Sequence, residues 1–313
     1  MTFQQNQGWI YREQVPKSGA GQTILQYYSQ KYRHSTETQW RERIIAGQIF
    51  LNGDRPAPET KLKSGQHLEY HRPPWYEPAV PLDYKILYED EDLIAIDKPG
   101  GLPVLPGGNF LQHTLWWQLQ QDYPHHTPVP VHRLGRGTSG LMLLARSHLA
   151  KSVLSQQMRA NSSENKPEKE IIKVYRTLVT DNSIPDQLTI RDRIGKIPHP
   201  TLGYIYGATP TGKFALSKCQ VLQRYSNSTL VEVTILTGRP HQIRIHLAAA
   251  GYPLLGDPLY LPGGIPKLPS ATKKTPLPGD CGYHLHAYRL CFNHPRSSVR
   301  MDLKCPLSFN NDQ

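Results

Sequence analysis

A glycine-rich loop leads directly into an apolar segment near the middle of this 313-residue chain. The loop contains Gly135, Gly137 and Gly140, and this density of glycine marks a loop whose path is set by backbone geometry. The segment that follows, residues 141–145 (LMLLA), is wholly apolar, as strands buried on both faces are. The loop lacks the Gly-Lys-Ser/Thr ending of a nucleotide-binding loop, which disfavours that type of phosphate site.

Other segments predict further strands and few helices. Residues 171–179 and 230–236 alternate apolar with polar side chains, and residues 87–99 read as two strands around an acidic turn. Residues 84–313 are therefore predicted to form an α+β domain, with a mixed, largely antiparallel central sheet and flanking helices. Two polar or proline-rich stretches, near 161–170 and 262–280, have the composition of inserted loops.

The N-terminal part predicts a separate small α/β module over residues 20–73. Thr36 with Gln39 forms a plausible capping box for the second of two helices, and Asn52-Gly53 is typical of a tight hairpin turn. Residues 1–19 are expected to be an extension. The proline-rich segment 74–83 is expected to be a stiff linker between the module and the larger domain.

Charge and composition restrict the partners. The net charge of +11 and the pI near 9.4 favour a polyanionic partner such as RNA. No run approaches the roughly 20 apolar residues that span a bilayer, and the N-terminus lacks the apolar centre of a signal peptide, so we expect a cytoplasmic protein without a membrane partner. The four cysteines have no zinc-ligand spacing, and neither a metal nor a cofactor is expected.

The loop sequence HRLGRGTSGL at residues 132–141 resembles the signature of the RluA-type RNA pseudouridine synthases. The resemblance continues in the family order through further segments, which are residues 97–104, 173–175, 236–247, 256–260 and 285–287. The small module resembles the RNA-binding domain of a ribosomal small-subunit protein. Its basic face would comprise Lys31, Arg33, Arg41 and Arg43.

This resemblance implies roles for particular residues. Tyr175 would lie against the target base, Leu285 beneath it, and Arg133 would enter the RNA helix in place of the flipped uridine. Arg244 would pair with the catalytic aspartate. These four residues are expected to line one cavity. Further contacts with RNA are expected from His132, Arg136, Arg239 and His241.

Gly135 occupies the position of the catalytic aspartate of that family. Uridine isomerisation must break the bond from N1 to the sugar and rejoin the base through C5, which requires a basic oxygen that glycine does not provide. Arg244 would then need another carboxylate, with Asp257 the nearest in motif order and Asp97 or Asp280 as alternatives. With Arg136 beside the vacant position, we expect a positively charged pocket.

Three functions remain open from the sequence. The first is a monomeric RNA pseudouridine synthase acting on rRNA or tRNA, with an acid supplied from elsewhere in the chain. The second is an RNA-binding protein that has lost catalysis on the same scaffold. The third, a hydrolase or nucleotide-binding enzyme that uses the glycine-rich loop, has no visible nucleophile and base to support it.

Overall fold

The computed structural model describes residues 5–160, 171–180, 182–199, 202–267 and 276–307. The chain divides into two compact units, residues 1–78 with 198–204, and residues 79–197 with 205–313. The predicted insertion at 161–170 lies outside the described residues, as does the 268–275 part of the insertion predicted at 262–280. None of the helices in the described ranges is long and apolar enough to cross a membrane.

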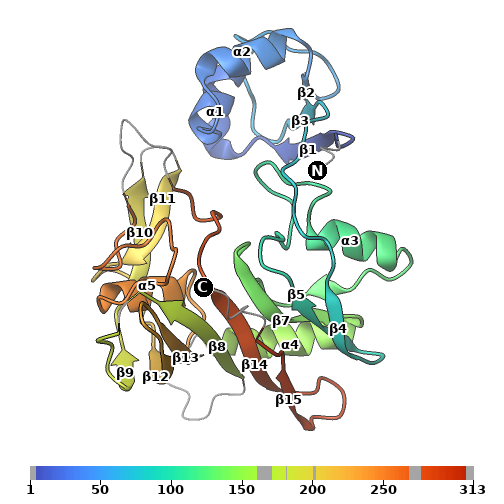
Figure 1. Ribbon diagram of the computed structural model, residues 1–313. Helices are drawn as coiled ribbons and strands as arrows, with labels where there is room; N and C mark the ends of the chain where they lie inside the picture. The colour runs from blue at the N-terminus through green and yellow to red at the C-terminus, as the bar shows by residue number, and fades with distance from the viewer. Residues whose placement is uncertain (1–4, 161–170, 181, 200–201, 268–275, 308–313) are drawn as a thin grey trace. The chain divides into compact units, whose positions relative to one another are not determined.

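The smaller unit packs two helices on a three-stranded antiparallel sheet of order β1-β3-β2. Its elements are β1 (Trp9–Gln14), the short 3-10 helix η1 (Lys17–Gly19), α1 (Ile24–Lys31), α2 (Glu37–Ile45), β2 (Ile49–Leu51) and β3 (His67–Arg72) (Figure 1). Trp40, Ile24 and Leu68 lie in its core, with at most 1% of each exposed. The helix-helix-hairpin order agrees with the sequence prediction.

Local sequence signals explain how this unit begins and turns. The capping box predicted at α2 is confirmed: the Gln39 amide donates to Thr36 Oγ1 at 3.2 Å, and the Thr36 amide donates to Gln39 Oε1 at 2.9 Å. Asn52 and Gly53 have φ of 52° and 92°, as a two-residue hairpin turn requires. Strand β1 was not predicted, because residues 1–19 were assigned to an extension, but it pairs with β3 along its whole length.

The larger unit is built on a ten-stranded sheet of order β4-β5-β7-β14-β8-β13-β12-β9, with β15 paired to β14 and β6 to β7. Its strands are β4 (Lys85–Glu89), β5 (Leu93–Lys98), β6 (Val129–Pro130), β7 (Thr138–Ala145), β8 (Ile172–Val179), β9 (Gln187–Ile190), β12 (Ser217–Arg224), β13 (Thr229–Ile235), β14 (Leu285–Asn293) and β15 (Arg300–Lys304). Strands β10 (Ile194–His199) and β11 (Gly203–Ala208) form a separate two-stranded sheet.

Helices cover the two halves of this sheet with two separate cores. Helices α3 (Leu115–Asp122) and α4 (His148–Ala160) pack against β5 and β7, whereas α5 (Gln242–Ala249) packs against β8 and β13 (Figure 1). Most neighbouring strands are antiparallel, but β14 and β7 are parallel. The predicted α+β class with a mixed sheet is therefore confirmed.

The parallel pairing of β7 with β14 joins the two halves of the sheet and spans three residue pairs, from Thr138↔Leu285 to Gly140↔Ala287. It places the glycine-rich loop next to the residues that precede β14. Gly140 has φ of 101°, and a Cβ there would lie 2.5 Å from the Ala287 carbonyl oxygen and 2.8 Å from the Ala287 nitrogen. Only glycine fits this contact without moving a strand.

We therefore expect Gly140→Ala to lower the free energy of unfolding by more than about 2 kcal/mol, because the new methyl group collides with the backbone of β14. Gly107→Ala is the matched control, since a Cβ at Gly107 meets no atom within 4 Å and its φ is not positive. Urea unfolding of the two variants beside the wild type measures both effects. Equal loss in the two variants would contradict the assignment of Gly140 as the close contact.

Candidate functional site

The glycine-rich loop is fastened to the segment after β5 by main-chain contacts. The Gly101 amide donates to the Arg136 carbonyl at 2.8 Å, and the Thr138 amide donates to the Gly135 carbonyl at 3.0 Å. The Lys98 ammonium, fully buried, donates to the carbonyl oxygens of Leu102 at 2.9 Å, Pro99 at 2.7 Å and Arg136 at 3.4 Å. Burial lowers the Lys98 pKa to about 7.

Tyr283 packs against this loop beside Gly135. A Cβ at Gly135 would lie 3.1 Å from the Tyr283 hydroxyl oxygen and 3.4 Å from Thr138 Oγ1. A Cβ at Gly137 would lie 2.9 Å from Tyr283 Cζ. The phenol therefore lies beside the space that a side chain at position 135 would begin to occupy.

Arg244 has a carboxylate partner, and it is Asp257. Arg244 Nε and Nη2 each donate to one Asp257 carboxylate oxygen at 2.7 Å, with 2% and 1% of the two side chains exposed. Arg244 Nη1 donates to the Pro278 carbonyl at 3.1 Å, and the rings of Tyr283 and Tyr260 lie 4.1 and 5.0 Å from the guanidinium carbon. This pairing removes the basis for the positively charged pocket predicted from the sequence, because the Arg244 charge is compensated.

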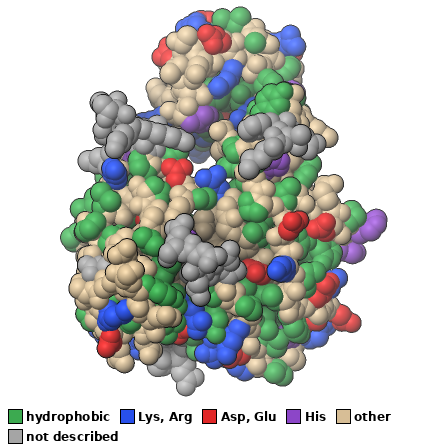
Figure 2. Space-filling view, in the orientation of Figure 1, with side chains coloured by type: hydrophobic (Ala, Val, Ile, Leu, Met, Phe, Trp, Pro, Cys, Tyr) green, Lys and Arg blue, Asp and Glu red, His purple; other side chains and the backbone are tan. Residues whose placement is uncertain are grey.

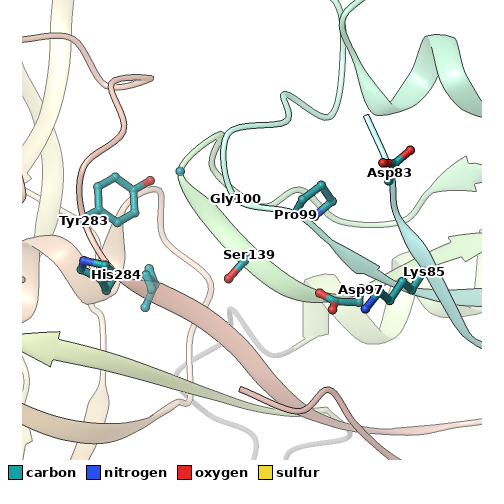
Figure 3. A pocket seen from close by; sticks show the side chains of 10 residues that line it. Asp83, Lys85, Asp97, Pro99, Gly100, Ser139, Tyr283 and His284 are labelled. Atoms are coloured by element: carbon teal, nitrogen blue, oxygen red, sulfur yellow. The ribbon is translucent and has the colours of Figure 1, made fainter. Parts of the chain in front are cut away.

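A cavity of about 400 Å³ lies beside the loop in the larger unit. Tyr283 and His284 lie on one side of it, and Asp97, Lys85 and Ser139 lie on the other (Figure 3). Its lining is completed by Asp83, Pro99, Gly100, Gly137 and Leu285. Two carboxylates and one ammonium face this space, which again differs from the expected positive pocket.

The four residues expected to line one cavity do not all do so. Leu285 lines it, 6% exposed at the start of β14. Tyr175 lies on β8 opposite Ala287, half-buried, and burial raises its pKa to about 12. Arg244 lies against Tyr283, which does line the cavity. Leu285 and Tyr283, the neighbour of Arg244, thus line this cavity together, and the meeting of all four residues at one nucleoside stays a prediction.

Three residues of the loop were expected to contact RNA, and they have different surroundings. Arg133 is exposed, while its neighbour His132 is half-buried. The Leu143 amide donates to His132 Nε2 at 3.0 Å, so this histidine also holds the loop to β7. Arg136 Nε donates to the Gly279 carbonyl at 2.7 Å, and its guanidinium lies 5.0 Å from the Phe110 ring centre. Of these three, Arg133 is the side chain directed to solvent.

Arg239 and His241, both expected to contact RNA, directly precede helix α5. Arg239 Nε donates to the Phe214 carbonyl at 2.8 Å. His241, in the left-handed conformation at φ 55°, has Nδ1 2.8 Å from the Tyr260 hydroxyl, which itself donates to the Tyr206 carbonyl at 2.8 Å. The hydroxyl therefore accepts from a protonated Nδ1, and burial lowers the His241 pKa to about 4.

In the smaller unit, the four predicted basic residues have different surroundings. Lys31 forms an ion pair with Glu13, and Arg41 forms one with Glu59 at 2.8 Å. Arg43 stacks on Trp40, 4.5 Å from the ring centre, while Arg33 is exposed. On the face seen in Figure 2, basic side chains are interspersed with acidic ones.

Among the described residues, no group of three or more His, Cys, Asp or Glu side chains is arranged to hold a metal ion.

Sequence reasoning missed Tyr283, because a tyrosine in an unremarkable segment carries no signal of a contact with a loop some 150 residues earlier. Asp257 was named as the nearest candidate partner for Arg244, and it is the partner.

We expect Asp257→Asn to destabilise the larger unit by about 3 to 5 kcal/mol, because it leaves a buried guanidinium without a compensating charge. Asp302→Asn is the control: it breaks an equally short bidentate pair with Arg289, but 39% and 42% of those side chains are exposed. The control should lose less than about 1 kcal/mol. If denaturant unfolding gave similar losses of unfolding free energy for both variants, burial would not be what makes the Arg244–Asp257 pair important.

The folded state should weaken in mild acid through His132. Burial lowers its pKa from 6.5 to about 3, so between these values the unfolded chain binds the proton and the folded chain does not. Its contribution to stability is therefore complete above pH 6.5 and is lost as the pH falls towards 3. We expect His132→Gln to flatten the pH dependence of the unfolding free energy between pH 6.5 and 4, which urea unfolding at a series of pH values measures.

Comparisons with known proteins agree with this arrangement. A family model described as RNA pseudouridylate synthase matches residues 92–249. The chain is 49% identical to an uncharacterized RNA pseudouridine synthase of Synechocystis, covering 91% of this chain and 94% of that one. It is 40% identical to RNA pseudouridine synthase 5 of Oryza sativa, covering 97% and 88%.

Two further similarities extend the comparison. Ribosomal large subunit pseudouridine synthase D of Neisseria meningitidis is 32% identical over 88% of this chain and 72% of its own length. The solved structure of human RNA pseudouridylate synthase domain containing 1 has a TM-score of 0.55 at 22% identity, covering 75% of this chain and 87% of that one, and so shares the fold. The chain belongs to the RNA pseudouridine synthase family.

Proposed function

We propose that this chain converts uridine to pseudouridine in RNA, acting as a monomer in the cytoplasm on rRNA or tRNA. The observation that carries the proposal is the cavity of about 400 Å³ between the glycine-rich loop and the start of β14. That volume falls within the range of about 300 to 1,000 Å³ that holds small ligands, and a single nucleoside is of that class. The relative named for the large ribosomal subunit supports rRNA as one substrate.

The reaction needs the target nucleotide to leave the RNA stack, and the loop carries a side chain suited to replacing it. Arg133 is exposed, and a planar guanidinium can stack on the bases that the flipped nucleotide leaves. Leu285 offers an apolar surface in the cavity for the face of the extruded uracil. We assign Tyr175 to contact with the base on the strength of its position in the family motif.

Binding of RNA without turnover is a second candidate function, and Gly135 favours it. The position lacks a carboxylate, and Arg244, which the family resemblance pairs with that carboxylate, is already paired with Asp257. Asp97 and Asp83 face the cavity, so acidic oxygens are present in the site but come from other segments. Turnover measurements separate the two candidates.

The test is incubation of the purified full chain with unmodified rRNA and tRNA, followed by mass spectrometry of the nucleosides. We expect pseudouridine to form. We expect Arg133→Ala to slow its formation, because no side chain then occupies the space that the flipped nucleotide leaves in the RNA stack. Arg159→Ala, an exposed arginine in the last turn of α4, is the matched control and should act like the wild type. RNA binding without any pseudouridine in either pool would refute the synthase proposal and leave the binding function.

A further inference from the structure

We infer that the Tyr283 hydroxyl is the polar group that this chain presents to the target nucleoside in place of a side chain at position 135. The inference rests on the proposed function and extends it to one residue. Its first support is location. The hydroxyl oxygen lies 3.1 Å from where Cβ of residue 135 would be, and Tyr283 lines the same cavity as Leu285 (Figure 3).

The glycines of the loop are what admit the phenol. A Cβ at Gly137 would lie 2.9 Å from Cζ of Tyr283, closer than real Cβ atoms approach, and 3.1 Å from its hydroxyl oxygen. At Gly135 the corresponding approach is to the hydroxyl oxygen itself. A side chain at 135 would therefore press on the phenol at 283, and the phenol would have to move by a few tenths of an ångström to admit its Cβ.

The ring is held rigidly on its other face. The Arg244 guanidinium lies 4.1 Å from its centre and is itself fixed by two hydrogen bonds to Asp257 and one to the Pro278 carbonyl. The Thr138 hydroxyl, at the start of β7, hydrogen-bonds the Tyr283 hydroxyl. A hydroxyl fixed by stacking and by a hydrogen bond is preorganised, and preorganised donors are the kind that stabilise charge in a transition state.

The chemistry follows from the protonation state. Burial raises the Tyr283 pKa while Arg244 opposes this effect, so at neutral pH the phenol keeps its proton. A phenol that keeps its proton can donate a hydrogen bond to a substrate acceptor. Tyr283 is thus a neutral hydrogen-bond donor and is not prepared to act as a nucleophile.

A donor suits one step of the isomerisation. When the N1–C1′ bond breaks, its electron pair moves onto the uracil ring and increases the negative charge on the ring oxygens. A hydrogen bond from Tyr283 stabilises that charge without transferring its proton. The C5–C1′ bond then forms, and the proton that C5 loses is balanced by the proton that N1 gains, so the product is an isomer of the substrate.

The experiment combines Tyr283→Phe, Gly135→Asp and the double variant, with the single-turnover rate and the RNA dissociation constant measured for each. Tyr283→Phe removes the hydroxyl and keeps the stacked ring, so we expect a loss of about 10²-fold in rate with unchanged RNA affinity, the scale of removing one preorganised donor. Tyr288→Phe, on β14 and outside the residues that line the cavity, is the matched control and should keep the wild-type rate.

The double variant supplies a second, independent criterion. When Tyr283 is present, an Asp introduced at position 135 crowds the phenol oxygen, so Gly135→Asp alone should lower the single-turnover rate. In the Tyr283→Phe background that oxygen is gone, so the same substitution should raise the rate. Two results with an active wild type would overturn this inference alone. One is a wild-type rate for Tyr283→Phe, and the other is an equal change of rate for Gly135→Asp with and without the Tyr283 hydroxyl. An inactive wild type would overturn the proposed function and this inference with it.

Discussion

The site depends on one short backbone contact, the parallel pairing of β7 with β14. Each half of the sheet has its own core and its own helices, and the three residue pairs from Thr138 to Gly140 connect them. Parallel pairing requires that both strands start at the same end of the sheet. The loop before β7 and the segment before β14 consequently meet, although they are distant in the sequence. The cavity lies at that meeting point.

The buried pair of Arg244 and Asp257 has a second role besides compensating its own charges. Two charges removed from water are costly unless further hydrogen bonds satisfy them. Here the Pro278 carbonyl accepts from Arg244, the Leu259 and Tyr260 amides donate to Asp257, and two tyrosine rings flank the guanidinium. The result is a rigid support behind Tyr283. Because the guanidinium is fully engaged, its influence on the cavity is exerted through the phenol that it positions.

Prediction from the sequence succeeded where the determining interactions are local. The Thr36–Gln39 capping box and the Asn52-Gly53 turn are set by neighbouring residues, and both were read correctly. The α+β class followed from strand patterns, and the family from motif order. Strand β1 was missed because it is an edge strand whose burial alternates weakly, so its partner β3 and not its own pattern defines it.

The rest of the site required coordinates, because it is made by contacts between remote segments. Motif order ranked Asp257 first for Arg244, but it did not reveal that the pair is sealed from solvent beneath two aromatic rings. Nor did it reveal that Tyr283 reaches Gly135, since no periodicity links them. Motif order also does not identify which of these side chains line the cavity, because that depends on packing between remote segments.

Lys98 anchors the glycine-rich loop through contacts that do not depend on the neighbouring side chains. The cage around its amine is made of main-chain oxygens from Pro99, Leu102 and Arg136, and every amino acid carries that oxygen. Replacement of the surrounding side chains therefore leaves the cage intact. A loop anchored in this way owes its shape to main-chain atoms, so side chains on it can be substituted without loss of the anchor.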